Sequence, residues 1–130
     1  MANEHMQIGQ VAERTELSIK TIRHYDEVGL VTPSARSIGG FRLYTESDIS
    51  RLLVIRRMKP LGFTLEEMKQ LLDSLEVLAD DASDASSRTA ATEFIADCHT
   101  RAEDSCRHLR KQLAYAEELT ALLADPARRP

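Results

Sequence analysis

An apolar stripe in the last third of the sequence is the feature that most limits how this chain of 130 residues can fold. Apolar and small side chains recur there at steps of three and four, which is the period of one face of an α-helix. The stripe predicts one helix of about 30 residues and roughly 50 Å, and a helix cannot bury such a stripe by itself. We therefore predict a two-stranded coiled coil between identical chains, a homodimer, formed by Ile95, Cys98, Ala102, Cys106, Leu109, Leu113, Ala116, Leu119 and Leu123.

Charge is divided unevenly along the chain. Residues 1–60 contain nine Lys and Arg against seven Asp and Glu, whereas residues 61–130 contain eight against fourteen. The first part is therefore the candidate for binding a polyanion such as nucleic acid, although the net charge of the whole chain is −4. The second part suits a solvated helix better than a phosphate-binding surface.

Length and residue types exclude several classes of protein. The chain is long enough for one compact domain with an appendage and too short for a large multidomain enzyme. No apolar stretch approaches the roughly 20 residues of a membrane helix, and the first residues lack the regions of a secretory signal. We expect a cytoplasmic protein with reduced cysteines and no membrane partner. The sequence lacks the usual signs of an enzyme, which are a cluster of Ser, His and Asp, a Gly-rich phosphate loop or paired carboxylates. We therefore expect no enzyme activity and no cofactor.

Two short amphipathic segments near the N-terminus predict a helix-turn-helix. Apolar residues recur at helical spacing in residues 8–12 and again in residues 19–28. Ser18 is placed to cap the second helix, and Gly29 is placed to end it. A tight turn joins the two helices.

A small β-hairpin is predicted over residues 36–44, turning at a Gly-Gly pair. Arg42 and Tyr44 alternate with Phe41 and Leu43 along its second strand. We expect the first pair on the outer side, where DNA would lie, and the second pair against the core. The hairpin would then be a wing.

Two further helices follow, each with a capping signal. Thr45 with Asp48 opens the third helix, which ends at Pro60, and Thr64 with Glu67 opens the fourth. Residues 79–92 have no large apolar side chain and resemble a hinge or a weak helix start. We predict a mainly α fold in three parts: a winged-helix DNA-binding domain at 1–78, a hinge at 79–92 and a coiled-coil dimerisation helix at 93–124.

Several motifs together resemble the head of the MerR family of transcriptional regulators. They are IGQVA at 8–12, TIRHYDEVGL at 21–30, Pro33, GFRLY at 40–44 and LGFTLEE at 61–67. The resemblance covers residues 7–75 and implies a winged helix-turn-helix, with the turn at 62–64 as a second wing. It also implies an antiparallel coiled-coil dimer that bends and untwists an overlong promoter spacer and so controls RNA polymerase, usually in response to an effector.

The DNA-binding residues are predicted from side-chain chemistry and from the resemblance. Arginine near the start of a recognition helix can bind guanine, and hydroxyls and cations can bind phosphate. Three residues have a structural alternative: Tyr25 could pack in the core, Arg23 could be an ordinary solvated surface residue, and Arg42 could keep an edge strand soluble. The candidates are Ser18, Lys20, Thr21, Arg23, Tyr25, Arg36, Arg42, Tyr44 and Lys59.

Two cysteines in the tail have the chemistry of metal ligands. Cys98 and Cys106 lie eight residues apart, which is roughly 12 Å along one helix and too far for one chain to form a site. We interpret both as packing residues and expect no metal, with a thiol switch or a metal site between subunits as the alternative.

The sequence departs from the family at Glu16, where the resemblance leads us to expect glycine in a left-handed turn. A left-handed Glu costs about 1 kcal/mol or more, which affects stability and leaves the fold intact. The alternative function is a DNA-bending architectural factor without an effector, similar to an excisionase.

Overall fold

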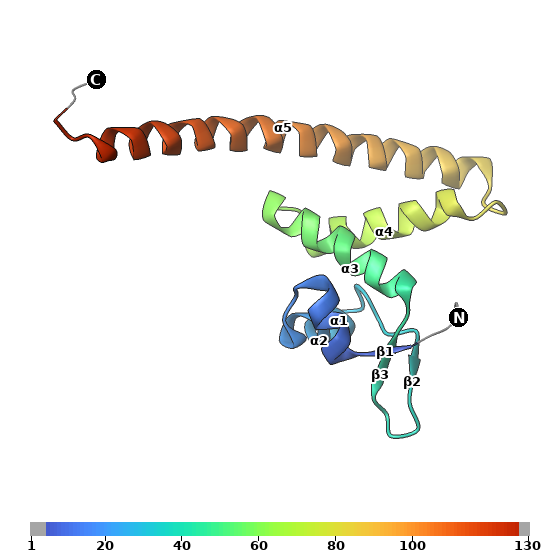
Figure 1. The fold of residues 1–130 in the computed structure, drawn as a ribbon. Coiled ribbons are helices and arrows are strands. Elements are labelled where there is room, and N and C mark those ends of the chain that lie inside the picture. Colours follow the sequence, from blue (N-terminus) through green and yellow to red (C-terminus); the bar gives the residue numbers. More distant parts are fainter. Residues whose placement is uncertain (1–4, 128–130) are drawn as a thin grey trace.

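The computed structural model describes residues 5–127 and confirms a winged helix-turn-helix head with a long C-terminal helix (Figure 1). The helix-turn-helix and a small sheet lie on one side of the head, and the long helix α5 lies on the opposite side, with α3 and α4 between them. The helices are α1 (Ile8–Thr15), α2 (Ile19–Glu27), α3 (Glu46–Met58), the 3-10 turn η1 (Lys59–Leu61), α4 (Leu65–Ala79) and α5 (Ala85–Ala124).

Three short strands form the sheet of the head. They are β1 (Met6–Gln7), β2 (Ala35–Arg36) and β3 (Arg42–Tyr44), with β3 in the centre and antiparallel to both neighbours. The strands β2 and β3 form the wing, and its turn is closed by the Gly40 amide, which donates to the Ser37 carbonyl at 2.9 Å.

Local hydrogen bonds place the helix starts where the sequence predicts them. The Ser18 hydroxyl accepts from the Thr21 amide at 3.0 Å and caps α2. Complete capping boxes open α3, between Thr45 and Asp48, and α4, between Thr64 and Glu67. Each cap satisfies amides that the first helical turn leaves without partners.

The predicted orientation of the wing is wrong. Tyr44, expected outside, is fully buried, and Phe41, expected inside, is 64% exposed, whereas Arg42 and Leu43 are both half-buried. Tyr44 pairs in register with Met6, itself a core residue, and comes two residues before α3, so its face of β3 turns toward the head. Phe41 lies in the hairpin turn before β3 begins, beyond the reach of the core.

The long helix begins earlier than predicted. It starts at Ala85 rather than 93, so most of the segment expected as a hinge is helical and only a short turn separates α4 from α5. The Asp84 carboxylate caps the helix by accepting from the Ser87 amide at 2.7 Å. The Arg88 guanidinium donates to the carbonyls of Leu78 at 3.3 Å and Asp80 at 3.1 Å, which joins the end of α4 to the start of α5. The domain boundaries otherwise remain a prediction.

The apolar stripe of α5 divides into two parts. Ile95, Cys98 and Ala102 are half-buried and line an apolar cavity of about 330 Å³ between α5 and the head, so the chain itself covers part of the stripe. The remaining positions are exposed: Cys106, Leu109, Leu113, Ala116, Leu119 and Leu123. No helix among the described residues is long and apolar enough to cross a membrane.

Candidate nucleic-acid interface

The start of α2 presents two exposed cations beside a rigid cap. The hydroxyls of Ser18 and Thr21 bond each other at 2.8 Å, so both have a structural role in the cap. Lys20 and Arg23 are exposed and form no ion pair within residues 5–127. These two cations, three residues apart, lie on one face of the helix and can reach base edges or phosphates.

Two of the predicted DNA contacts belong to the core instead. Tyr25 is 2% exposed and Tyr44 is 0% exposed. Burial raises the pKa of both phenols above the ordinary value, because the charged form loses its solvation. The packing alternative is therefore the one that the structure supports for Tyr25. Tyr44 has no surface through which it could contact DNA, and its hydroxyl has no hydrogen-bond partner within the described chain.

The two wing arginines meet one carboxylate on α2 that sequence reasoning missed. Asp26 Oδ2 accepts from Arg42 Nε at 2.6 Å and from Arg36 Nη2 at 3.2 Å. The hydrogen bond to Asp26 raises the pKa of Arg42, which keeps the guanidinium charged. The structure thus brings α2 and the wing together. A sequence signal existed, since two arginines opposite each other in a hairpin need a nearby acid.

Lys59 and the second turn form a separate region. Lys59 is exposed in η1, which packs against α3. Gly62 follows with a φ of 83°, a left-handed conformation that glycine adopts without steric cost. Phe63 is 8% exposed, so the apolar residue of the predicted second wing packs into the head.

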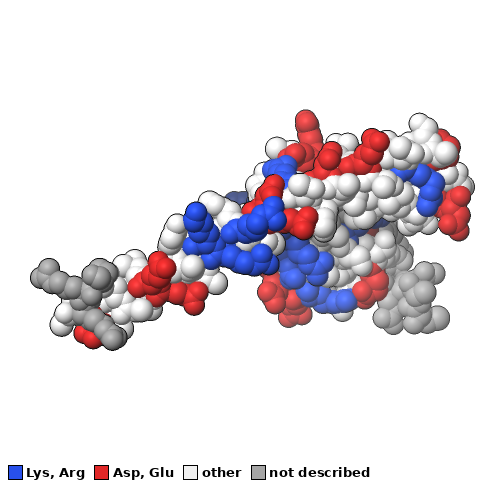
Figure 2. All heavy atoms as spheres, turned by 90° about the horizontal axis from the view of Figure 1, so that it is seen from above, with Lys and Arg blue, Asp and Glu red and all other residues white. Residues whose placement is uncertain are grey.

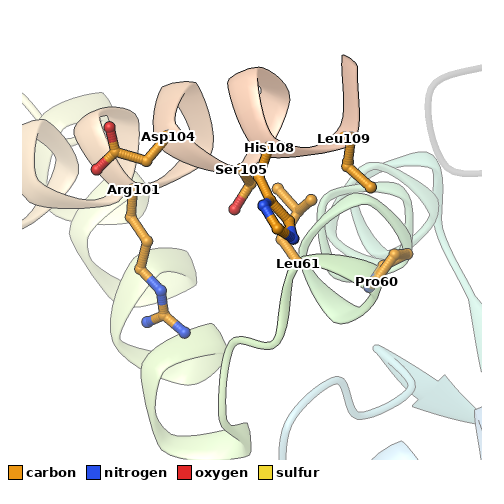
Figure 3. Close-up of a pocket in the computed structure, with 7 residues that line it drawn as sticks. All are labelled: Pro60, Leu61, Arg101, Asp104, Ser105, His108 and Leu109. Carbon is orange, nitrogen blue, oxygen red and sulfur yellow. The ribbon is translucent and has the colours of Figure 1, made fainter. Parts of the chain in front are cut away.

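Arg101 of α5 holds this second turn from the tail. Its guanidinium lies 4.1 Å from the centre of the Phe63 ring and donates to the Gly62 carbonyl at 2.9 Å and to Glu67 Oε2 at 2.6 Å. The bond from the Thr64 amide, and then Arg101, hold the pKa of Glu67 below its ordinary value. Figure 3 shows Arg101 at the edge of a cavity of about 350 Å³ between η1 and α5, lined by Pro60, Leu61, Asp104, Ser105, His108 and Leu109.

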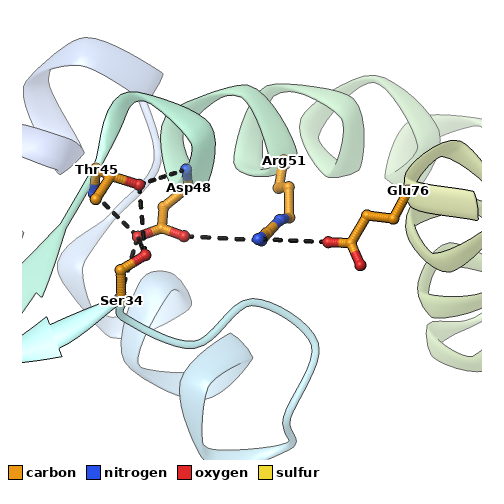
Figure 4. A network of polar contacts seen from close by, with 5 residues as sticks. All are labelled: Ser34, Thr45, Asp48, Arg51 and Glu76. Atoms are coloured by element: carbon orange, nitrogen blue, oxygen red, sulfur yellow. Dashed lines mark hydrogen bonds and ion pairs between the residues drawn. The ribbon is translucent and has the colours of Figure 1, made fainter. Parts of the chain in front are cut away.

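A buried carboxylate connects the recognition region to the helices behind it (Figure 4). Asp48 is 1% exposed and accepts from the Ser34 hydroxyl at 2.7 Å and from the Thr45 amide at 2.9 Å. Arg51 lies 3.9 Å from Asp48 and 3.4 Å from Glu76 of α4. These contacts set the segment before β2 against α3, and α3 against α4.

The tail offers no assembled metal site within the described residues. Cys98 is half-buried and Cys106 is exposed. Burial raises the pKa of the Cys98 thiol, so less of it is thiolate at neutral pH. Seen from the α5 side, acidic side chains surround a group of Lys and Arg side chains near the middle of the view (Figure 2).

A helix-turn-helix whose second helix presents two exposed cations, flanked by a hairpin that carries two arginines, defines a winged helix-turn-helix DNA-binding protein. Comparison with known proteins identifies the family. The chain belongs to the MerR family: residues 6–75 match the family described as MerR HTH family regulatory protein, and residues 49–125 match the family described as MerR, DNA binding.

Individual relatives agree with this assignment. The HTH-type transcriptional regulator CueR of Salmonella typhimurium is 34% identical over 117 residues, which are 90% of this chain and 78% of that protein. The HTH-type transcriptional activator mta of Bacillus subtilis is 46% identical over 67 residues, which are 52% of this chain and 26% of that protein. A MerR-family regulator from Bacillus thuringiensis has the same fold, with a TM-score of 0.71 at 24% identity, covering 91% of this chain and 98% of that one.

Proposed function

We propose that this protein regulates transcription by binding a promoter sequence as a homodimer through α2 and the wing. The observation that carries the proposal is the joining of α2, which presents two exposed cations in its first turns, to the two wing arginines in a chain of the MerR family. Arg23 would read a base in the major groove, and Arg36, Arg42, Lys20 and Lys59 would bind phosphates. No catalytic role is proposed.

The DNA contacts are tested on a duplex selected from a randomised library. Arg23→Ala is expected to weaken specific binding by about 1–3 kcal/mol and to relax the preference at one base pair in each half-site. The matched control is Arg110→Ala, which removes an exposed arginine from α5 and leaves binding unchanged. Equal loss on every sequence would assign Arg23 to phosphate binding, and no loss would remove it from the interface.

The homodimer is supported by the exposed part of the α5 stripe. Leu109, Leu113, Leu119 and Leu123 are 51%, 59%, 55% and 64% exposed, and leucines at this spacing on a helix favour a coiled-coil partner. Leu109→Asp is expected to dissociate the dimer in sedimentation. Arg110→Asp places the same charge one position further along the helix and should not. A folded monomer in the unmutated protein would refute the coiled coil.

Promoter distortion would explain how binding alters transcription. The deformation of a bent and untwisted spacer costs on the order of 1–6 kcal/mol, which protein–DNA contacts must offset. Footprinting with transcription by RNA polymerase from the same promoter tests this role. A change in transcript yield on binding supports regulation, whereas bending without such a change supports the alternative, an architectural factor.

An effector that acts on the regulator is part of the proposal. A ligand that binds only the folded state stabilises it by mass action and so raises the melting temperature. At a ligand concentration of a hundred times the Kd, the free energy of unfolding rises by about 2.7 kcal/mol. Melting the protein with metals, oxidants and small aromatic or cationic compounds is the direct search. A compound that stabilises the protein must also change transcription to count as an effector.

A further inference from the structure

The wing carries two positive charges at directly opposed positions. Arg36 of β2 and Arg42 of β3 are paired in register, and like charges placed opposite each other destabilise a hairpin. The wing has little other support, because β2 is two residues long and β3 is three. A counter-charge is therefore needed to keep both arginines in one place without DNA.

Asp26 supplies that counter-charge from the last turn of α2. Its side chain is 11% exposed, and the single oxygen Oδ2 bonds both arginines, at 2.6 Å to Arg42 and 3.2 Å to Arg36. Two cations share this one carboxylate, and Glu27, at the next position of α2, adds a weaker electrostatic attraction on Arg42. The Arg42 guanidinium stays charged and can still bind a phosphate.

The atoms used by each arginine differ. Arg42 bonds Asp26 through Nε, and no hydrogen bond within residues 5–127 uses its Nη atoms. Arg36 uses Nη2 for Asp26 and Nη1 for the Gly40 carbonyl at 3.4 Å. The Nη atoms of Arg42 are therefore the donors that remain, held at a set position relative to α2.

We propose that Asp26 is a positioning residue for DNA binding: it holds Arg42 by Nε so that the remaining guanidinium donors bind a backbone phosphate while α2 occupies the major groove. The inference rests on the proposed function. By its charge alone, Asp26 repels DNA. As a positioning residue, it strengthens DNA binding. Pre-ordering the arginine reduces the conformational entropy lost on binding.

The sign of one substitution separates the two roles. If Asp26 only repels phosphate, Asp26→Asn tightens DNA binding and steepens its dependence on salt. If Asp26 positions Arg42, the same substitution weakens binding, by about three- to tenfold, because a neutral Asn side chain holds two guanidinium groups less firmly than a carboxylate does. The salt slope should then flatten by about 0.9 for each lost phosphate contact, so by roughly 2 for two protomers.

The experiment measures anisotropy of a fluorescein-labelled duplex of mixed sequence between about 50 and 200 mM KCl. Asp26→Asn is compared with Glu27→Gln, which removes an exposed carboxylate that acts on Arg42 through its charge and forms no hydrogen bond to it within the described residues, and which should leave binding equal or slightly tighter. Asp26→Glu should restore part of the slope. In an Arg42→Ala background, Asp26→Asn should add no further loss.

A second variant tests the geometry without altering Asp26. Arg42→Lys keeps the charge but replaces the planar guanidinium by a single ammonium, so it cannot bond Asp26 through one nitrogen and offer separate nitrogens to a phosphate. We expect weaker binding and a flatter slope than in the unmutated protein. Unchanged binding by Arg42→Lys, or equal or tighter binding by a folded Asp26→Asn protein, would overturn the inference. Failure of the unmutated protein to bind any duplex would instead refute the proposed function.

Discussion

Replacing Tyr44 by Phe should stabilise the protein. The ring is fully buried and its hydroxyl has no hydrogen-bond partner within the described chain. An unsatisfied buried hydroxyl costs about 1–3 kcal/mol, and removing one oxygen leaves a gap that costs only a few tenths of a kcal/mol. The net gain is about 1 kcal/mol. For a chain of this length that corresponds to a rise of roughly 4 °C in Tm.

The assay is thermal and urea unfolding at one protein concentration, beside binding to the selected duplex. Tyr115→Phe is the matched control, because Tyr115 is 57% exposed on α5. DNA affinity should not change in Tyr44→Phe, since the side chain has no exposed surface. Destabilisation by 1 kcal/mol or more would mean that the hydroxyl has a buried partner, and weaker DNA binding would return Tyr44 to the interface.

The same substitution has a pH signature. Burial, and then the charge of Asp26, raise the pKa of Tyr44 in the folded state above the ordinary value of about 10. A raised pKa means that the folded state holds the proton more tightly, so stability falls as pH rises above about 10. Tyr44→Phe should lose less stability than the unmutated protein in that range. An identical alkaline decline in both proteins would contradict the burial argument.

Three other substitutions test the turns and the tail. Glu16 has a φ of 59° and is exposed, so Glu16→Gly should stabilise the protein by up to about 1 kcal/mol. The control Glu13→Gly, within α1, should destabilise it by a similar amount. If chemical unfolding shows the same sign of change for both variants, the left-handed backbone of Glu16 is not strained. Arg88→Ala removes hydrogen bonds to carbonyls at the end of α4, so it should lower the free energy of unfolding by about 1–2 kcal/mol. It should also speed amide hydrogen exchange at the start of α5. Unchanged exchange would argue against a link between α4 and α5 through Arg88. Replacing both Cys98 and Cys106 by serine should lower Tm and leave regulation intact. If this variant binds DNA normally but no longer responds to an oxidant or thiophilic metal that acts on the unmutated protein, the cysteines form a thiol switch.

Local signals in the sequence predict the positions of most elements correctly. The caps at Ser18, Thr45 and Thr64 bond amides three residues away, so their consequences are contained within a few residues of sequence. Glu16 is left-handed as the family pattern predicts. The start of α5 differs from the prediction, because small and polar residues also form a helix when Asp84 caps it and Arg88 joins it to α4.

The identity of the DNA-facing residues depends on more than local signals. Residue chemistry selects Arg23, Arg36 and Arg42 as candidates, and it equally selects Tyr25 and Tyr44, which the core buries. A tyrosine beside an apolar face serves either role, and only the packing of neighbouring elements separates them.

By itself, the sequence determined the helix-turn-helix, the hairpin, the capped helices and the long amphipathic tail, because periodicity and caps act within a few residues. The tertiary structure decided which face of β3 turns inward, that Asp26 holds both wing arginines, and that α4 covers the first part of the α5 stripe. These features join residues ten or more positions apart in sequence. Such contacts depend on the closure of the whole head around one core, and no local pattern specifies which side chains meet there.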